Sequence, residues 1–177
     1  MRKLTQILKF KRLYSSESFT NSFRILAEES LVSWLDDSSK QPKIDYLIVD
    51  VREPADYTTA HIKTAINIPS TVMLGNNAPS FFGSLLAQQL LHPINNEFRI
   101  PKNLVFHCQL SLIRGPNSAA RLIQLLDEEK RRRQRTAPDS VKELEPTDIY
   151  VLDGGFKGWS KAFAGIRPEL IEGIGKK

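Results

Sequence analysis

The stretch VFHCQLSLIRGP, residues 105–116, carries the clearest structural pattern in this sequence. An apolar, β-prone run leads to Cys108, the one cysteine of the chain, and five residues separate Cys108 from Arg114. Gly115 and Pro116 then open a helix-like segment, residues 117–129, whose apolar side chains recur at helical spacing. The pattern predicts a strand, a tight loop and a helix, with the cysteine at the end of the strand.

A loop of this kind suits an oxyanion. Backbone N–H groups at a helix N-terminus converge on one concavity, and the helix dipole adds partial positive charge there. The guanidinium of Arg114 matches two oxygens of a tetrahedral anion in a geometry that lysine does not reproduce. The same field favours the thiolate form of Cys108, which is the nucleophile. We therefore expect Cys108 to attack a bound phosphate-like anion; the alternative for a lone cysteine is a small buried side chain.

Length and composition limit the function classes. The chain has 177 residues, 41% of them hydrophobic, which is enough for one domain with a real core. No apolar run approaches the ~18 residues of a membrane span, so no membrane partner is expected. A single cysteine excludes an internal disulfide, and a reactive Cys108 has no resolving thiol within the chain. The sequence carries no signal for an oligomeric state.

The net charge of +5 does not indicate nucleic-acid binding. Residues 1–16 contain five basic residues and no acid, so the whole excess lies in that segment. The segment is amphipathic if helical and is typical of a mitochondrial targeting presequence cleaved near Tyr14 and Ser15, which predicts the mitochondrial matrix. The alternative is a disordered basic tail, with the protein in the cytoplasm and nucleus.

The remaining hydrophobic pattern predicts an α/β domain. A nearly continuous apolar strand over 46–51 is typical of a strand covered on both faces. We further expect a strand over 23–26, helices over 28–35 and 79–91, a surface turn at His92 and a polar connection over 136–148. The basic run 130–135 is interpreted as a solvated helix end, with a nuclear localisation signal or an acidic-partner patch as the alternative.

The order of residues around these elements resembles the rhodanese-like domain. The resemblance is carried by DVRE at 50–53, by His61-Ile62, by AINIP at 65–69 and by IYVLDGGFKGW at 149–159. It implies a central, mostly parallel five-stranded sheet with helices on both faces, spanning residues 22–168 and followed by a tail at 169–177. It also implies structural roles for Asp50, Arg52 and His61.

The length of the cysteine loop separates the chemistries within this family. Sulfurtransferase loops resemble a cysteine with four residues and then a basic or variable residue, whereas this chain has five residues before Arg114. The loop is similar to the signature of the M-phase inducer (cell-division-cycle-type) dual-specificity phosphatases and of small eukaryotic arsenate reductases. The resemblance implies a protein-tyrosine-phosphatase-like hydrolase acting through a cysteinyl-phosphate intermediate on a phosphorylated protein or a small phosphate ester.

In this resemblance Cys108 is the nucleophile and Arg114 clamps the anion. The backbone of the loop forms the cradle, contributed by Gln109, Leu110, Ser111, Leu112 and Ile113. His107 would tune the thiolate from beneath the loop, Ser111 would orient loop amides or assist thiolate departure, and Gly115 leaves room for an anion to approach the backbone. No metal or cofactor is expected.

The loop departs from the larger phosphatases because it holds no glutamate between Cys108 and Arg114. No residue is assigned as the acid that protonates the leaving group, and Asp153 is interpreted as a turn residue. We therefore expect a slow phosphatase. The first alternative is an arsenate reductase that uses glutathione or another external thiol. The second is a thiosulfate sulfurtransferase or a non-catalytic regulatory module.

Overall fold

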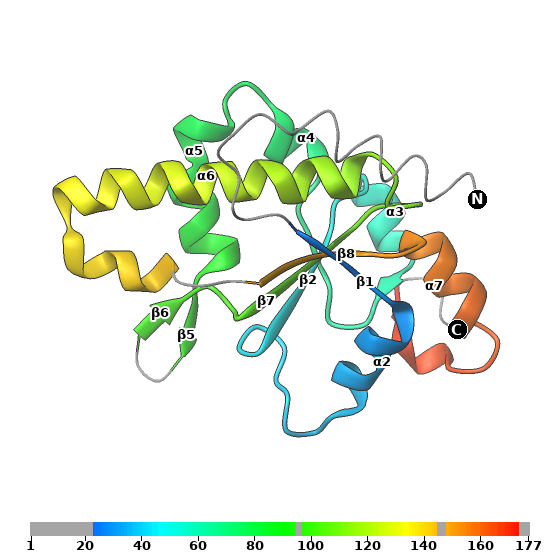
Figure 1. The fold of residues 1–177 in the computed structure, drawn as a ribbon. Helices are drawn as coiled ribbons and strands as arrows, with labels where there is room; N and C mark the ends of the chain where they lie inside the picture. Colours follow the sequence, from blue (N-terminus) through cyan, green and yellow to red (C-terminus); the bar gives the residue numbers. More distant parts are fainter. Residues whose placement is uncertain (1–22, 95–96, 145–147, 174–177) are drawn as a thin grey trace.

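The computed structural model describes residues 23–94, 97–144 and 148–173, so the predicted presequence at 1–16 lies outside the described residues. The described part is built on one five-stranded sheet of strand order β1-β8-β7-β2-β4, in which every neighbouring pair is parallel (Figure 1). The strands are β1 (Arg24–Leu26), β2 (Tyr46–Asp50), β4 (Ile66–Asn67), β7 (Asn103–His107) and β8 (Asp148–Leu152). This arrangement confirms the predicted fold class.

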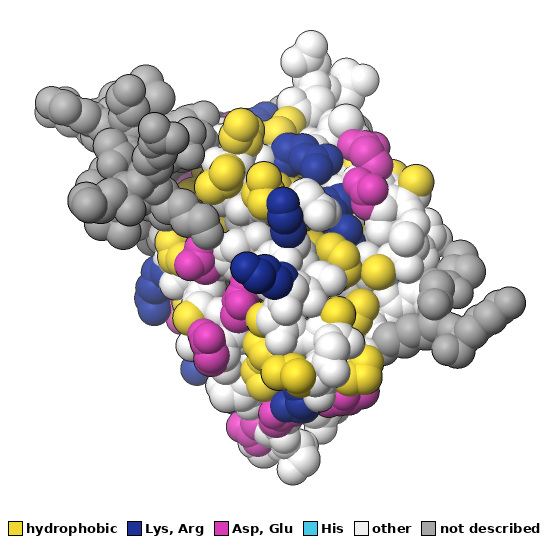
Figure 2. Space-filling model, turned by 90° about the vertical axis from the view of Figure 1, so that its right-hand side faces the viewer, with side chains coloured by type: hydrophobic (Ala, Val, Ile, Leu, Met, Phe, Trp, Pro, Cys, Tyr) yellow, Lys and Arg dark blue, Asp and Glu magenta, His cyan; other side chains and the backbone are white. Residues whose placement is uncertain are grey.

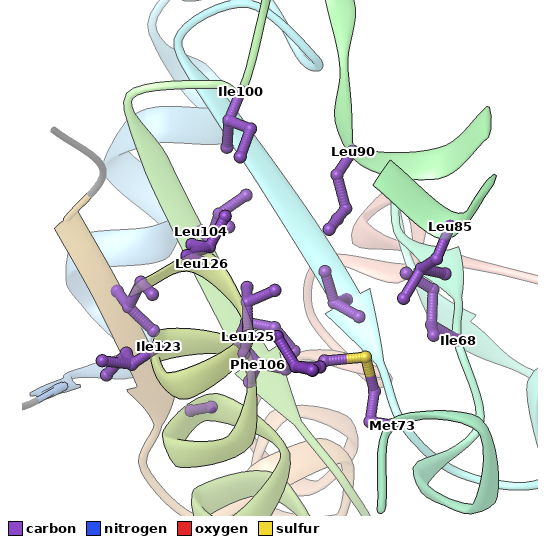
Figure 3. Close-up of a cluster of buried hydrophobic side chains, with 14 of the residues drawn as sticks. Ile68, Met73, Leu85, Leu90, Ile100, Leu104, Phe106, Ile123, Leu125 and Leu126 are labelled. Atoms are coloured by element: carbon purple, nitrogen blue, oxygen red, sulfur yellow. The ribbon is translucent and has the colours of Figure 1, made fainter. Parts of the chain in front are cut away.

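Helices cover both faces of this sheet. Side chains alternate across each strand, so the strands present apolar side chains on both faces, and both need cover. On β7, Leu104 and Phe106 belong to one buried cluster and Val105 to the other. The first cluster lies beneath α4 (Ser70–Leu74), α5 (Ala78–Leu85) and α6 (Arg114–Thr136), and Figure 3 shows part of it. The second lies beneath α2 (Glu28–Asp36) and α7 (Gly155–Phe163), next to the short helix α3 (Pro54–Thr59). No described helix is long and apolar enough to cross a membrane.

Two small antiparallel pairs complete the described structure. Strand β3 (His61–Ile62) pairs with β9 (Ile171–Glu172), and β5 (His92–Ile94) pairs with β6 (Glu97–Arg99). A 3-10 helix, η3 (Pro168–Leu170), leads into β9. Leu170 and Ile171 are buried, and the indole of Trp159 donates a hydrogen bond to the carbonyl of Leu170 at 3.3 Å. The fold therefore continues past residue 168, where the sequence predicted a tail.

Several element boundaries differ from the prediction. Helix α6 has 23 residues and extends beyond the predicted range 117–129 at both ends, so the basic run 130–135 lies within it. Glu129 stabilises its last turns, because its carboxylate accepts hydrogen bonds from Arg132 and Arg133, three and four residues further along the helix. The predicted helix at 79–91 is α5 followed by a π-helix, η1 (Leu86–Leu90).

The prediction for His92 was wrong, and the connection over 136–148 holds an element that the sequence did not predict. His92 does not lie in a surface turn, because it opens β5 and pairs with Arg99. The polar connection predicted over 136–148 contains a 3-10 helix, η2 (Pro138–Leu144), and Leu144 at its end is buried in the cluster beneath α6. One buried leucine in an otherwise polar segment gave no periodic signal.

Candidate active site

Cys108 lies at the carboxyl edge of the sheet, the edge at which α/β domains place their ligands. It directly follows β7, residues 109–113 form the loop, and α6 begins at Arg114. The side chain is buried, with 4% of the residue exposed. The structure therefore has the strand, loop and helix that the sequence predicted, with the cysteine at the end of the strand.

Helix α7 holds this loop from one side, and sequence reasoning missed that contact. The N–H of Phe156 donates to the carbonyl of Cys108, and the N–H of Lys157 donates to the carbonyl of Gln109, each at 2.9 Å. No peptide bond in the described structure is cis, so each N–H points opposite to the carbonyl of its own peptide plane. The amides of Gln109 and Leu110 therefore point away from α7, as an anion cradle requires.

The contact between α7 and the loop depends on Gly155. Its φ is +60°, and a Cβ at this position would lie 2.5 Å from the carbonyl oxygen of Cys108 and 2.8 Å from the amide nitrogen of Ser111. Any other residue would therefore push the loop and the helix apart. The sequence signal was the pair Gly154-Gly155, which entered the prediction only as part of the motif at 149–159.

The loop and the first turn of α6 concentrate polar side-chain atoms that are buried without a hydrogen-bond partner. Six such atoms occur in the described structure, and four of them fall between residues 107 and 118: His107 Nε2, Ser111 Oγ, Asn117 Oδ1 and Ser118 Oγ. Ser111 also has a φ of +50°, an uncommon conformation for a residue with a side chain. Such gathered exceptions are expected where a ligand is to be bound.

Gly115 and Arg114 leave space and donors beside Cys108. A Cβ built on Gly115 would lie 3.5 Å from both the amide nitrogen of Cys108 and the Oγ of Ser111, so these two groups flank one small space. The half-buried side chain of Arg114 makes no hydrogen bond or ion pair anywhere in the described ranges. Its guanidinium donors are thus available to an anion.

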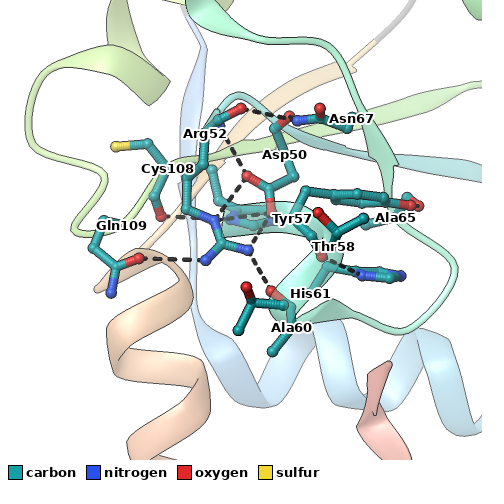
Figure 4. Close-up of polar contacts among 12 residues, drawn as sticks. Asp50, Arg52, Tyr57, Thr58, Ala60, His61, Ala65, Asn67, Cys108 and Gln109 are labelled. Atoms are coloured by element: carbon teal, nitrogen blue, oxygen red, sulfur yellow. Dashed lines mark hydrogen bonds and ion pairs between the residues drawn. The ribbon is translucent and has the colours of Figure 1, made fainter. Parts of the chain in front are cut away.

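A buried ion pair supports the loop from the β2 side (Figure 4). The guanidinium of Arg52 donates to both carboxylate oxygens of Asp50, at 2.6 to 3.0 Å, and to the carbonyl of Ala60 at 2.6 Å. It also reaches the Oε1 of Gln109 at 3.4 Å and lies 4.0 Å from the ring centroid of Phe156. Arg52 therefore joins β2, the end of α3, the cysteine loop and α7, which is the structural role expected of it.

His107 lies beneath the loop, but it faces the backbone of Cys108. Its Nδ1 is 3.4 Å from the carbonyl oxygen of Cys108. Burial lowers the pKa of His107, against the opposing effect of Asp50, whose carboxylate lies 3.8 Å from Nε2. The imidazole is therefore neutral and acts on the shape of the loop.

Two further side chains, His61 and Trp159, make packing contacts, and Asp153 makes a turn contact. His61 stacks on Tyr57, with ring centroids 3.9 Å apart, and its Nδ1 lies 2.8 Å from the Tyr57 carbonyl oxygen. Asp153 is exposed and accepts the N–H of Gly154, which fits the predicted turn role. Trp159 is fully buried in the cluster beneath α7. Within the residues described, no group of three His, Cys, Asp or Glu side chains is placed to hold a metal ion.

Together these features place a buried cysteine, a tight loop and an arginine without a described partner at the carboxyl edge of a parallel α/β sheet. Residues 31–162 match the Rhodanese-like domain, and the chain belongs to this family. The family assignment from the sequence is thereby confirmed.

Relatives include phosphatases that carry the same domain. Over 134 residues the chain is 32% identical to M-phase inducer phosphatase 2 of Mus musculus. The aligned region makes up 76% of this chain and 20% of that protein. The chain therefore spans about a fifth of that relative. It is 26% identical over 151 residues to the dual specificity phosphatase ibp1 of Schizosaccharomyces pombe, covering 83% of this chain and 94% of ibp1.

Solved structures agree with the fold. Yeast Ygr203w, described as a protein tyrosine phosphatase of the rhodanese family, matches with a TM-score of 0.60 and 25% identity, covering 88% of this chain and 95% of its own. The As/Sb reductase of Leishmania major matches with a TM-score of 0.56 and 21% identity, covering 88% and 91%. The reductase shows the shared fold alone.

Proposed function

We propose that this protein is a cysteine-dependent phosphatase that acts through a cysteinyl-phosphate intermediate on phosphorylated protein. The observation that carries the proposal is the guanidinium of Arg114. It lacks a partner in the described structure, and Arg114 lies at the opposite end of the loop 109–113 from Cys108. The related M-phase inducer and dual specificity phosphatases support it.

The first step is an in-line displacement. The thiolate of Cys108 attacks phosphorus, an S–P bond forms, and the ester P–O bond breaks with its electron pair going to the leaving alkoxide or phenoxide. The amides of the loop and the guanidinium of Arg114 bind the phosphoryl oxygens, whose charge is thereby stabilised in the transition state. The hydroxyl of Ser111, buried without a partner, is a further donor at the floor of the loop.

The second step regenerates the thiolate. Water attacks phosphorus, the S–P bond breaks with its electron pair returning to sulfur, and inorganic phosphate leaves. No described acid is positioned by a contact with the loop, so solvent protonates the leaving group in the first step. Substrates with good leaving groups, such as aryl phosphates and phosphotyrosine, are therefore hydrolysed fastest.

The test is hydrolysis of p-nitrophenyl phosphate by the purified protein. Cys108→Ser abolishes activity, and Arg114→Lys lowers kcat/KM by about 10²-fold, the effect of losing one donor to a developing charge. Arg131→Lys is the matched control, because Arg131 is exposed near the far end of α6. Mass spectrometry after acid quenching should find a phosphoryl group on Cys108.

The same preparation tests the alternative chemistries. If the wild type hydrolyses the ester no faster than the Cys108→Ser variant, the proposed phosphatase activity is refuted. Glutathione-dependent reduction of arsenate by such a preparation would instead support an arsenate reductase, in which the only cysteine of the chain needs an external thiol. Sulfur transfer from thiosulfate would support a sulfurtransferase.

A further inference from the structure

The cysteine loop has an inverted burial pattern. Its apolar side chains are exposed, with 45% of Leu110, 39% of Leu112 and 65% of Ile113 accessible to solvent. The hydroxyl oxygen of Ser111, between the two leucines, is buried and has no hydrogen-bond partner. The hydrophobic effect favours the opposite arrangement. The exposure of the apolar side chains and the burial of the hydroxyl are therefore both unfavourable.

The backbone explains how this inversion arises. Ser111 adopts a left-handed conformation, which turns its side chain inward, while Leu110 and Leu112 on either side turn outward. The amide of Ser111 is held close to Gly155, and its hydroxyl lies close to Gly115. A loop whose amides face a central anion has its side chains on the outer side, where they surround the mouth of the site.

These three side chains form a local apolar surface, which we call the rim. Of the six large hydrophobic residues that are exposed among those described, the rim contains three within four consecutive positions. Figure 2 views the molecule from the side on which α7 lies, and hydrophobic side chains are exposed at several places on this face among basic and acidic ones. Clustered apolar exposure of this kind marks an interaction surface.

We propose that the rim binds apolar side chains that flank the phosphorylated residue of a phosphopeptide substrate. This inference rests on the proposed function, which puts the phosphoryl group in the loop and the rest of the substrate at its mouth. The rim then contacts the neighbours of the phosphorylated residue. Because no residue between Cys108 and Arg114 is charged, a charged flanking side chain would lose water there and find no partner in the loop.

The experiment uses two phosphotyrosine peptides of equal length and net charge, with leucine or serine on both sides of the phosphotyrosine. Phosphate release by the full chain should give a kcat/KM about fivefold higher for the leucine peptide, which corresponds to about 1 kcal/mol. Ile113→Ser and Leu112→Ser should bring the ratio between the two peptides close to one. Because each ratio compares two substrates of one enzyme, a general loss of activity cancels.

Ile166→Ser is the matched control. Ile166 is 75% exposed and follows the end of α7 that is remote from the loop, so this variant should keep the wild-type ratio. A wild-type ratio near one, or an unchanged ratio in Ile113→Ser, would overturn the proposal that the rim binds the substrate and would leave the proposed phosphatase activity unaffected.

A second measurement separates the rim from the catalysis. Peptides with a non-hydrolysable phosphonate in place of phosphotyrosine are titrated against the same proteins. If the wild type prefers the leucine phosphonate but releases no phosphate from either ester, the proposed function fails and the rim stands. Binding of phosphatidylserine–phosphatidylcholine vesicles that Ile113→Ser abolishes, without any peptide preference, would assign the rim to a membrane and overturn the proposal.

Discussion

Replacing Gly155 by alanine should damage both the stability of the fold and the shape of the cysteine loop. The new Cβ would lie 2.5 Å from the carbonyl oxygen of Cys108 and 3.0 Å from the carbonyl carbon of Gln109, distances that require backbone movement. The left-handed conformation costs alanine about 1–2 kcal/mol. Weakening the two hydrogen bonds from α7 to the loop costs about 1 kcal/mol each. We expect a loss of about 3 kcal/mol in the free energy of unfolding.

Gly154→Ala is a matched control for this effect. Gly154 has a φ of +67°, so alanine meets the same backbone penalty of about 1–2 kcal/mol. Its new Cβ would meet the flexible side chain of Glu28 in α2 at 2.9 Å and the Cα of Gly158 within α7 at 3.2 Å, neither of which belongs to the loop. This variant should lose stability without a change in the loop.

The two variants are compared by urea unfolding and by kcat/KM for p-nitrophenyl phosphate, at a urea concentration where both are folded. A loop shift near 1 Å should lower kcat/KM of Gly155→Ala about 10²-fold, and Gly154→Ala should stay near the wild type. The alkylation rate of Cys108 by iodoacetamide gives a readout that needs no catalysis. Equal losses of kcat/KM in both variants, or full activity in Gly155→Ala, would refute the assignment of α7 as the support of the loop.

Two further predictions concern the buried groups beneath the loop. Arg52→Ala leaves the carboxylate of Asp50 buried without its partner and should lower the free energy of unfolding, measured in urea, by about 3–5 kcal/mol. The control Arg24→Ala breaks an exposed ion pair and should cost less than about 1 kcal/mol. Similar losses in the two variants would contradict the role of the buried pair. Because burial holds the pKa of His107 below its unfolded value of about 6.5, the stability from its neutral form is present above that pH and is lost as the pH falls below it. His107→Gln should remove this part of the pH dependence in urea melts from pH 7 to 5, and parallel profiles for the two proteins would show that His107 does not titrate there.

The sequence predicted the elements whose signal is local. Residues 46–50 form a buried strand because nearly every side chain is apolar, and β7 and α6 flank Cys108 because apolar periodicity changes from strand to helix there. The family resemblance supplied the mostly parallel five-stranded sheet, which no local pattern contains, and the strand order came only from the structure. Strand β9 was missed because two residues are too few to show alternation.

The support of the site could not be predicted because it depends on contacts between distant parts of the chain. Phe156 donates its N–H to Cys108 through the backbone, so no side-chain pattern marks the contact. Arg52 reaches Gln109 only because β2 and β7 are neighbours, with Asp50 opposite His107 in register. A sequence shows residue types, whereas these contacts follow from the strand order.

Departures from local rules point to the cysteine loop without any appeal to relatives. Natural sequences satisfy local rules nearly everywhere, and exceptions persist where function requires them. Residues 107–118 combine a left-handed serine, four buried polar atoms without partners, an arginine with no described partner and three exposed apolar side chains. Under the proposed function, an anion in the loop accepts hydrogen bonds from Arg114 and from the hydroxyl of Ser111, its apolar substituent covers the exposed side chains, and α7 and Arg52 hold the loop from behind.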